Sequence, residues 1–208
     1  MDTFDLSLYL VTDQSLSKGR SVEWIVEQAV MGGVTMVQLR EKNISTLDFL
    51  NKAIALKKLL SLFGIPLIIN DRLDIALASD ADGLHIGQSD MPYQIAREIL
   101  GYDKIIGLSV ETIAQAEEAN LLDVDYIGLS PVFSTNTKTD INTPLGLEGI
   151  ATIASFSHHP MVAIGGINVE NTPEIIKAGA HGVAVVSAIV SADDVKTAAQ
   201  QLKRVIQF

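Results

Sequence analysis

The chain has 208 residues, 48% of them apolar, and a formal net charge of −10. This size fits one domain with a full core, and the negative charge repels a phosphate backbone, so we expect no nucleic-acid partner. The absence of cysteine excludes disulfides, cysteine-ligated zinc and thiolate catalysis.

Neither a membrane span nor a leader is expected. The apolar stretches are shorter than the roughly 20 residues that a membrane helix needs. The acidic start at residues 1–5 lacks the basic and apolar regions of a signal peptide. We therefore expect a cytoplasmic protein with no membrane partner.

Eight short apolar runs recur along the chain and predict strands. They are Leu8–Thr12, Thr35–Leu39, Pro66–Asn70, Gly83–Ile86, Lys104–Ser109, Tyr126–Leu129, Met161–Ile164 and Val183–Val186. Several runs are continuously apolar, which is typical of strands buried on both faces of a parallel sheet.

Segments with helical spacing lie between these runs. Ser21 is the predicted N-cap of the first helix, which carries Trp24 in an expected core position and ends at Gly32-Gly33. The other predicted helices are Leu47–Phe63, Leu73–Ala78, Pro92–Leu100, Ile113–Leu122, Leu147–Phe156, Pro173–Ala178 and Val195–Ile206.

Strands that alternate with helices predict a parallel sheet, and eight such units can close into a (β/α)₈ TIM barrel. The alternative is an open doubly wound sheet, but no G-x-G-x-x-G motif follows the first run. We predict an α/β fold in which residues 1–208 form a single TIM-barrel domain. The longest irregular stretch, 130–146, is expected to be an active-site loop.

The second run carries an unusual polar face. In a TIM barrel the active site lies at the C-terminal ends of the strands. Side chains alternate along a strand, so Gln38, Arg40 and Lys42 share one face. Two cations and an amide on a buried strand favour an anionic ligand. The alternative is an internal salt bridge to Asp13 or Asp71.

Two carboxylates follow neighbouring strands. Asp71 comes after the third run and Asp90 after the fourth. Converging carboxylates repel unless a cation lies between them, and Mg²⁺ binds carboxylate and phosphate oxygens. Each residue alone fits a helix N-cap. Beside the basic second run, the pair favours a Mg²⁺ site.

Glycines and hydroxyls follow the last two strands. Gly165-Gly166 ends the seventh run and Val186-Ser187 the eighth. Loops after these strands often bind phosphate, because glycine allows close approach of the backbone. Residues 134–138 add hydroxyls and a lysine that suit an anion, although such a cluster also fits a solvated loop. His85 is expected to line the barrel as a neutral, hydrogen-bonded core residue.

Nine segments carry a family resemblance. In order they are YLVTD (9–13), GVTMVQLREK (33–42), IINDRLDIA (68–76), ADGLHIGQSD (81–90), IGLS (106–109), PVF (131–133), TNTK (135–138), AIGGI (163–167) and GVAVVSAI (182–189). The series resembles the thiamine-phosphate synthase (thiamine-phosphate pyrophosphorylase) family over nearly the whole chain.

This resemblance implies a Mg²⁺-dependent transferase of thiamine biosynthesis. Its partners would be small phosphorylated molecules: 4-amino-5-hydroxymethyl-2-methylpyrimidine diphosphate and a thiazole phosphate, which can carry a carboxylate. The products would be thiamine phosphate and pyrophosphate, with CO₂ from the carboxylated thiazole. The family reacts by dissociative substitution at the pyrimidine methylene.

The resemblance also assigns residues. The pyrimidine diphosphate would be bound by Gln38, Leu39, Arg40, Glu41, Lys42, Asn70, Ser109 and Lys138. Of these, Arg40, Lys42, Ser109 and Lys138 would be catalytic. Asp71 and Asp90 would hold Mg²⁺. The thiazole phosphate would be bound by Thr135, Asn136, Thr137, Gly166, Val186 and Ser187.

Two positions depart from the family pattern. Ser130 stands where the family usually has glycine, and Ser134 where it commonly has proline, so we expect altered behaviour of the long loop. Two alternatives stay open: a thiazole tautomerase-like isomerase on the same barrel, and a non-catalytic sensor of thiamine precursors. The sequence is compatible with a homo-oligomer.

Overall fold

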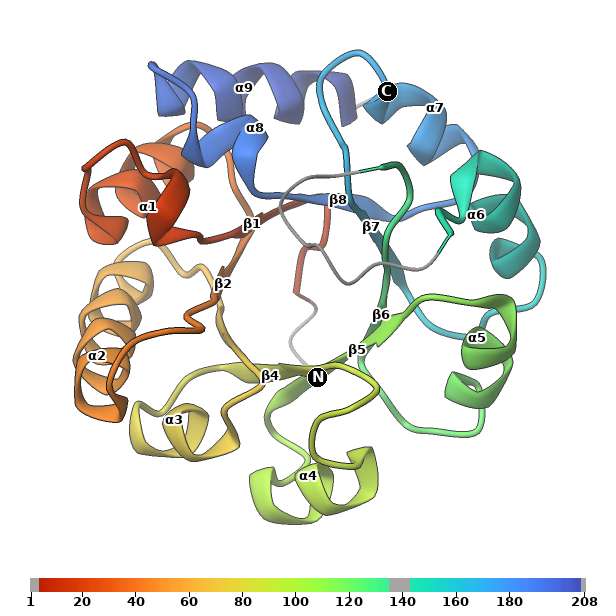
Figure 1. Ribbon diagram of the computed structural model, residues 1–208, viewed down its shortest axis with the longest axis horizontal. Coiled ribbons are helices and arrows are strands. Elements are labelled where there is room, and N and C mark those ends of the chain that lie inside the picture. The colour runs from red at the N-terminus through yellow and green to blue at the C-terminus, as the bar shows by residue number, and fades with distance from the viewer. Residues whose placement is uncertain (1–3, 135–142, 207–208) are drawn as a thin grey trace.

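Eight parallel strands close into a barrel in the computed structural model, which describes residues 4–134 and 143–206 (Figure 1). The strands are β1 (Leu8–Val11), β2 (Met36–Leu39), β3 (Leu67–Asn70), β4 (Gly83–Ile86), β5 (Ile105–Val110), β6 (Tyr126–Leu129), β7 (Met161–Ile164) and β8 (Gly182–Val185). β8 closes the ring on β1, with Tyr9 opposite Ala184. The predicted α/β class and TIM barrel are confirmed.

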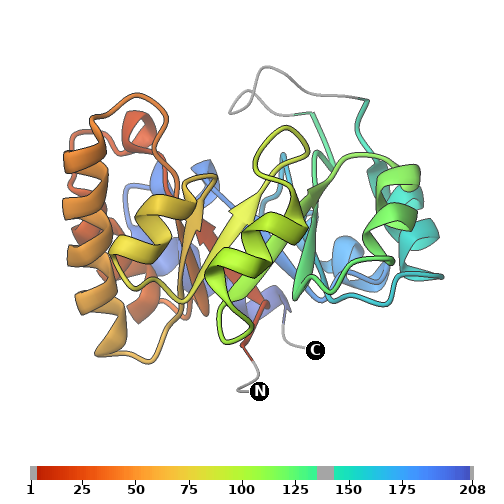
Figure 2. The same cartoon turned by 90° about the horizontal axis from the view of Figure 1, so that it is seen from below.

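Helices surround the barrel as an outer ring (Figure 1). They are the 3₁₀ helix η1 (Gln14–Leu16) and the α-helices α1 (Val22–Met31), α2 (Thr46–Ser61), α3 (Leu73–Ala78), α4 (Tyr93–Leu100), α5 (Ile113–Ala119), α6 (Gly146–Ala154), α7 (Thr172–Lys177), α8 (Ser187–Val190) and α9 (Val195–Ile206). In Figure 2 the loop after β4 lies at one end of the barrel and the start of β1 lies toward the other.

Sequence patterns located the elements well. Every strand end lies at, or one residue from, its predicted position. Ser21 caps α1 as predicted, because its side chain accepts a hydrogen bond from the Trp24 N–H. The prediction missed η1 and α8, since three or four residues are too few to show a helical period.

Two apolar layers form the core. Along β1, Leu8 and Leu10 pack outward against the helices, whereas Tyr9 and Val11 pack into the barrel interior. This alternation is the ordinary period of a strand. It decides which side chains reach the mouth of the barrel.

Trp24 does not lie in the core, so that expectation was wrong. It is 42% exposed, and the Arg20 guanidinium carbon lies 5.5 Å from its ring centroid. The buried side of α1 is made by smaller residues, among them Ile25 and Val26.

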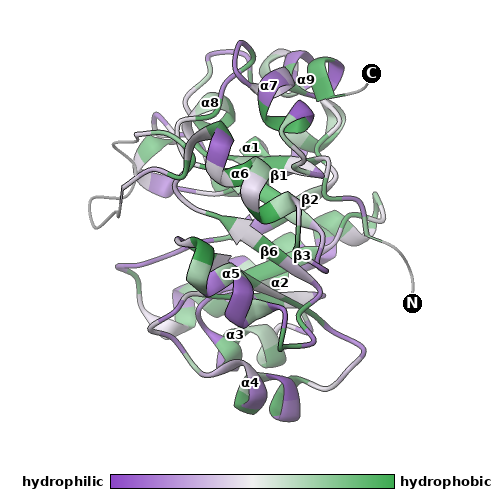
Figure 3. Cartoon of the chain, turned by 90° about the vertical axis from the view of Figure 1, so that its right-hand side faces the viewer, coloured by the Kyte–Doolittle hydropathy of each residue, from purple (hydrophilic) through white to green (hydrophobic). Residues whose placement is uncertain are grey.

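Hydropathy follows the same layers. In Figure 3 the strands are largely green or white, and purple stretches lie on helices and loops. Among the helices of the described chain, we find none that is both long enough and apolar enough to cross a membrane.

Candidate active site at the mouth of the barrel

A cavity of about 970 Å³ opens at the C-terminal ends of the strands. The structure brings together there most of the residues that the sequence singled out. The predicted site residues in its lining are Gln38, Arg40, Lys42, Asn70, Asp71, Asp90, Ser109, Gly166, Val186 and Ser187. Their convergence at this end agrees with the usual place of active sites in TIM barrels.

The basic face of β2 enters this cavity. Gln38 is 4% exposed and lies in the barrel interior. Arg40 Nη1 lies 3.6 Å from Asp13 Oδ2, and Lys42 forms an ion pair with Asp71. The internal salt bridges of the alternative interpretation therefore exist. Both cations still line the cavity, with side chains 25% and 49% exposed, so they remain open to an anion.

Two residues of the same run point elsewhere. The Leu39 side chain is fully buried in the layer that packs against the helices. Glu41 accepts a hydrogen bond from Lys52 Nζ on α2 at 2.5 Å, and its side chain is 6% exposed. Because side chains alternate along the chain, a ligand in the cavity would meet these two residues through their backbones.

Asp71 has a strained backbone. Its φ is +62°, in the left-handed region that favours glycine, and its N–H donates to the His85 carbonyl at 2.9 Å. The N-cap of α3 is Arg72, so Asp71 does not have the capping role that was its alternative. Strain of this kind is concentrated at functional sites.

Asp90 is held in a turn beside Asp71. Its Oδ2 accepts a hydrogen bond from the Gly87 N–H at 2.7 Å. Burial raises the pKa of Asp90, and the neighbouring Asp71 carboxyl raises it further. The N-cap of α4 is Pro92, so the capping alternative is not seen here either. Two neighbouring carboxylates of this kind suit a cation placed between them.

The oxygen donors fit a hard divalent cation. Within residues 4–134 and 143–206, no group of three or more His, Cys, Asp or Glu side chains is placed to hold a metal. Asp71 and Asp90 therefore supply two carboxylates at most. Mg²⁺ commonly uses one or two carboxylates, with waters and substrate phosphates as its other ligands.

Glycines shape the opposite side of the mouth. Gly165 and Gly166 have φ of +106° and +66°. A Cβ at Gly166 would lie 2.8 Å from the Ser134 carbonyl oxygen, so lack of space, in addition to the positive φ, requires glycine there. Val186 and Ser187, at the start of α8, line the same side. The predicted ligand residues Thr135, Asn136, Thr137 and Lys138 lie outside the described residues.

From sequence, Gln88 was assigned no role, and His85 was expected to line the barrel as a neutral, hydrogen-bonded core residue; both lie at the mouth. His85 is 9% exposed and places Nε2 2.9 Å from Ser109 Oγ. Gln88 Nε2 donates to the Ser109 carbonyl at 2.6 Å. A signal for His85 was present, because Leu84 and Ile86 on either side are apolar and face the helices, which turns His85 inward.

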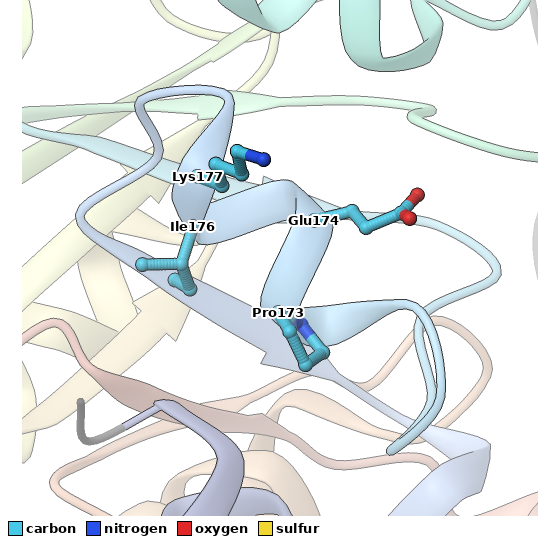
Figure 4. A pocket seen from close by; sticks show the side chains of 4 residues that line it. All are labelled: Pro173, Glu174, Ile176 and Lys177. Atoms are coloured by element: carbon cyan, nitrogen blue, oxygen red, sulfur yellow. The ribbon is translucent and has the colours of Figure 1, made fainter.

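A second hollow, on the outside of the barrel, has no comparable chemistry. It measures about 410 Å³ and is lined by Pro173, Glu174, Ile176 and Lys177 of α7 (Figure 4). Figure 4 shows Ile176 and Glu174 extending from opposite sides of the helix, so these side chains do not converge on one point.

The chain is similar in sequence to known proteins. The sequence profile of a family described as thiamine monophosphate synthase matches residues 8–189. A thiamine-phosphate synthase of Albidiferax ferrireducens is 53% identical over 201 residues, which are 97% of this chain and 92% of the relative. Another, of Clostridium novyi, is 50% identical over 198 residues, or 95% of this chain and 97% of the relative.

A solved structure is similar as well. It is described as thiamine phosphate pyrophosphorylase from Pyrococcus furiosus, and it is 38% identical to this chain. The likeness covers 97% of this chain and 96% of the other, with a TM-score of 0.89. Similarity in sequence and in fold therefore extends over nearly the full length.

Proposed function

The chain belongs to the thiamine monophosphate synthase family, and from this premise we propose that its barrel mouth joins a pyrimidine diphosphate to a thiazole phosphate. The products are thiamine phosphate and pyrophosphate. One observation carries the proposal: two cations, Arg40 and Lys42, line the same cavity as two interacting carboxylates, Asp71 and Asp90. A diphosphate with a divalent cation matches that arrangement of charge.

Asp71 and Asp90 would hold Mg²⁺. When bound, the ion neutralises charge on the diphosphate and so makes it a better leaving group. Without a cation, the two carboxylates would repel the substrate. The raised pKa of Asp90 supports this assignment, since burial beside a second carboxyl is unfavourable for its charged form.

Arg40 and Lys42 would stabilise the leaving group directly. Negative charge grows on the diphosphate as its bond to the pyrimidine methylene breaks, and fixed cations in a cavity lower the energy of that state. Ser109, Asn70 and Gln38 line the same cavity and would orient the substrate. A dissociative substitution depends on position and charge more than on a general base.

The thiazole phosphate would bind on the side of β7 and β8. Gly166, Val186 and Ser187 line the cavity there, where glycine permits close approach of a phosphate to the backbone. Thr135, Asn136 and Thr137 as further ligands, and Lys138 at the diphosphate, stay predictions. The thiazole nitrogen would then capture the pyrimidine methylene across the mouth.

The same observation weighs against the two alternatives. A thiazole tautomerase-like isomerase needs no diphosphate site, and so has no use for paired carboxylates beside two cations. A non-catalytic sensor does not require residues that stabilise a leaving group. The intact Asp71, Asp90, Arg40 and Lys42 set favours the synthase.

A direct assay tests the proposal. Purified protein is mixed with both substrates, with and without Mg²⁺, and thiamine phosphate and pyrophosphate are quantified. We expect both products in equal amounts and only with a divalent cation. Isomerised thiazole without pyrophosphate would instead establish the isomerase, and binding without turnover would establish the sensor.

Thermal unfolding tests the metal site separately. Mg²⁺ with inorganic pyrophosphate should raise the unfolding midpoint of the wild type, because a ligand that binds only the folded state stabilises it. The Asp90→Asn variant should lose most of this increase. An equal increase in both proteins would show that Asp90 is not a ligand.

A further inference from the structure

A chain of hydrogen bonds crosses the barrel interior beneath the mouth. Gln38 Nε2 donates to the Tyr9 hydroxyl at 2.9 Å, and the hydroxyl oxygens of Tyr9 and Tyr126 lie 2.9 Å apart. Tyr126 Oη lies 2.9 Å from His85 Nδ1, and His85 Nε2 lies 2.9 Å from Ser109 Oγ. These five side chains, from five different strands, are called the interior chain below.

Two glycines leave room inside the barrel for the interior chain. A Cβ at Gly107 would lie 2.1 Å from Tyr126 Cζ, and one at Gly128 would lie 3.2 Å from His85 Cε1. Neither glycine is among the residues with positive φ, so the reason for glycine is space and not backbone conformation. Any side chain at Gly107 would displace the Tyr126 ring.

The hydrogen bonds of the interior chain run in one direction, from Gln38 toward Ser109. Burial raises the pKa of both Tyr9 and Tyr126, so each keeps its single hydrogen at neutral pH. The Tyr9 oxygen accepts from Gln38, which leaves its own hydrogen for Tyr126. Tyr126 then donates to His85.

This direction determines which imidazole nitrogen of His85 carries the hydrogen. A neutral imidazole that accepts a hydrogen bond at Nδ1 carries its hydrogen on Nε2. That hydrogen points to Ser109 Oγ, 2.9 Å away. Ser109 thereby becomes an acceptor toward His85, and its own hydrogen is left for another partner.

We propose that Gln38, Tyr9, Tyr126 and His85 act as positioning residues that turn the Ser109 hydroxyl into a hydrogen-bond donor toward the diphosphate. This inference rests on the proposed function, which supplies the diphosphate. Gln88, two residues from Asp90, donates to the Ser109 carbonyl at 2.6 Å and so ties Ser109 to the turn with the carboxylate pair.

A Ser109 hydroxyl that donates its hydrogen toward the diphosphate suits the proposed reaction. As the carbon–oxygen bond breaks, both electrons move to the diphosphate, and a donor aimed at its oxygens stabilises that charge. A hydroxyl turned the other way would present its oxygen to the growing negative charge. Loss of the correct direction of the Ser109 hydroxyl should therefore lower kcat more than it changes KM.

The tautomer of His85 can be measured on the ligand-free protein. Nitrogen-15 NMR of the imidazole nitrogens, assigned with His85→Gln, should show hydrogen on Nε2 and none on Nδ1 at neutral pH. In Tyr126→Phe the Nδ1 resonance should shift and the opposite tautomer should appear. Hydrogen on Nδ1 in the wild type would overturn the proposed direction.

Kinetics test whether the interior chain acts through Ser109. Tyr126→Phe keeps the ring above Gly107 and removes the hydroxyl, and we expect kcat to fall about tenfold with KM within about twofold. In a Ser109→Ala background the same change should add no loss, because residues that act through one partner are not additive. Equal losses in both backgrounds would contradict the proposal.

Tyr93→Phe is the matched control. The Tyr93 hydroxyl donates to the Asp123 carbonyl and accepts from Arg97 Nε at 3.2 Å, away from the mouth. Its removal should lower the unfolding midpoint and leave kcat unchanged. A similar fall in kcat would mean that losing any buried phenol hydroxyl is enough, and that the interior chain has no special role.

A further measurement tests whether diphosphate oxygens accept a hydrogen bond from the Ser109 hydroxyl. Inhibition by inorganic pyrophosphate with Mg²⁺ should weaken about tenfold in Ser109→Ala if the hydroxyl donates to diphosphate oxygens. Unchanged inhibition would overturn that part of the proposal. A wild type that forms no thiamine phosphate would refute the proposed function, whereas the tautomer would still test the direction of the interior chain.

Discussion

Asp71 and Asp80 lie two residues before and two residues after α3, and locally they are nearly alike. Both are aspartates in the left-handed region, with φ of +62° and +51°, and both form an ion pair with a lysine. Asp71, however, is 22% exposed in the cavity beside Asp90, whereas Asp80 is 84% exposed at the other end of the barrel. Local chemistry alone therefore does not make a site.

The two ends of the barrel also differ in how completely their charges are paired. Away from the mouth, Arg97 is 5% exposed and donates to the Tyr93 hydroxyl, two backbone carbonyls and Asp125. Its bonds are typical of a structural residue. At the mouth, the described residues supply Arg40 with one acidic partner, Asp13 at 3.6 Å, and Arg40 borders a cavity, so it can accept a ligand.

The largest effect should come from Asp71→Asn. We expect kcat/KM to fall about 10²–10³-fold, because an electrostatic contact to the reacting group is lost. Asparagine tolerates positive φ, so the fold should survive. Asp80→Asn makes the same change in the same backbone conformation and should leave kinetics unaltered. Equal losses in kcat/KM would show that the two ends of the barrel do not differ in function.

Arg97→Met should have the largest effect on stability. Removing one partner of a buried ion pair costs about 3 kcal/mol in free energy of unfolding, measured by urea denaturation. The folded variant should keep its kcat, since Arg97 lies away from the cavity. Arg40→Met should show the reverse, with a large fall in kcat/KM and little change in stability.

Gly166→Ala should have an intermediate effect. Gly166 and Gly64 share a φ of +66°, but an added Cβ meets Ser134 at 2.8 Å in the first and nothing within 4 Å in the second. Backbone strain should cost about 1 kcal/mol in stability in both variants, and the close contact with Ser134 should make the loss larger in Gly166→Ala. Only Gly166→Ala should also raise KM for the thiazole phosphate, as measured by steady-state kinetics.

Lys57→Met should have the smallest effect. Lys57 Nζ lies 2.6 Å from Asp82 Oδ1, in a partly exposed pair away from the mouth. Such pairs contribute about 0–1 kcal/mol to stability, so the urea midpoint should change little and kinetics not at all. Lys42→Met breaks a similar pair at the mouth, and its kcat/KM should fall clearly. Similar kinetics for both variants would contradict the diphosphate site.

The period of two along each strand let the sequence predict much of the site. It assigned Gln38, Arg40 and Lys42 to one face, and all three line the cavity. The same period separates Leu39 and Glu41 from them, which the family resemblance alone had grouped together. Periodicity is local, so a single strand is enough to reveal it.

The interior chain could not be predicted in the same way. Tyr9 and Tyr126 are 117 residues apart, and their contact exists only because the barrel closes. The role of Gly107 is likewise invisible in sequence, because its reason is a ring that a different strand supplies.

By itself the sequence determined the order of strands and helices, the barrel class, and the end of the barrel where polar residues gather. These follow from hydrophobic period and chain direction, which are properties of neighbouring residues. Only the tertiary structure decided that Asp90 interacts with Asp71, that Arg40 pairs with Asp13, and that His85 connects Tyr126 to Ser109. Those contacts join side chains from different strands, and the pairing of neighbouring strands within the closed barrel brings them within reach.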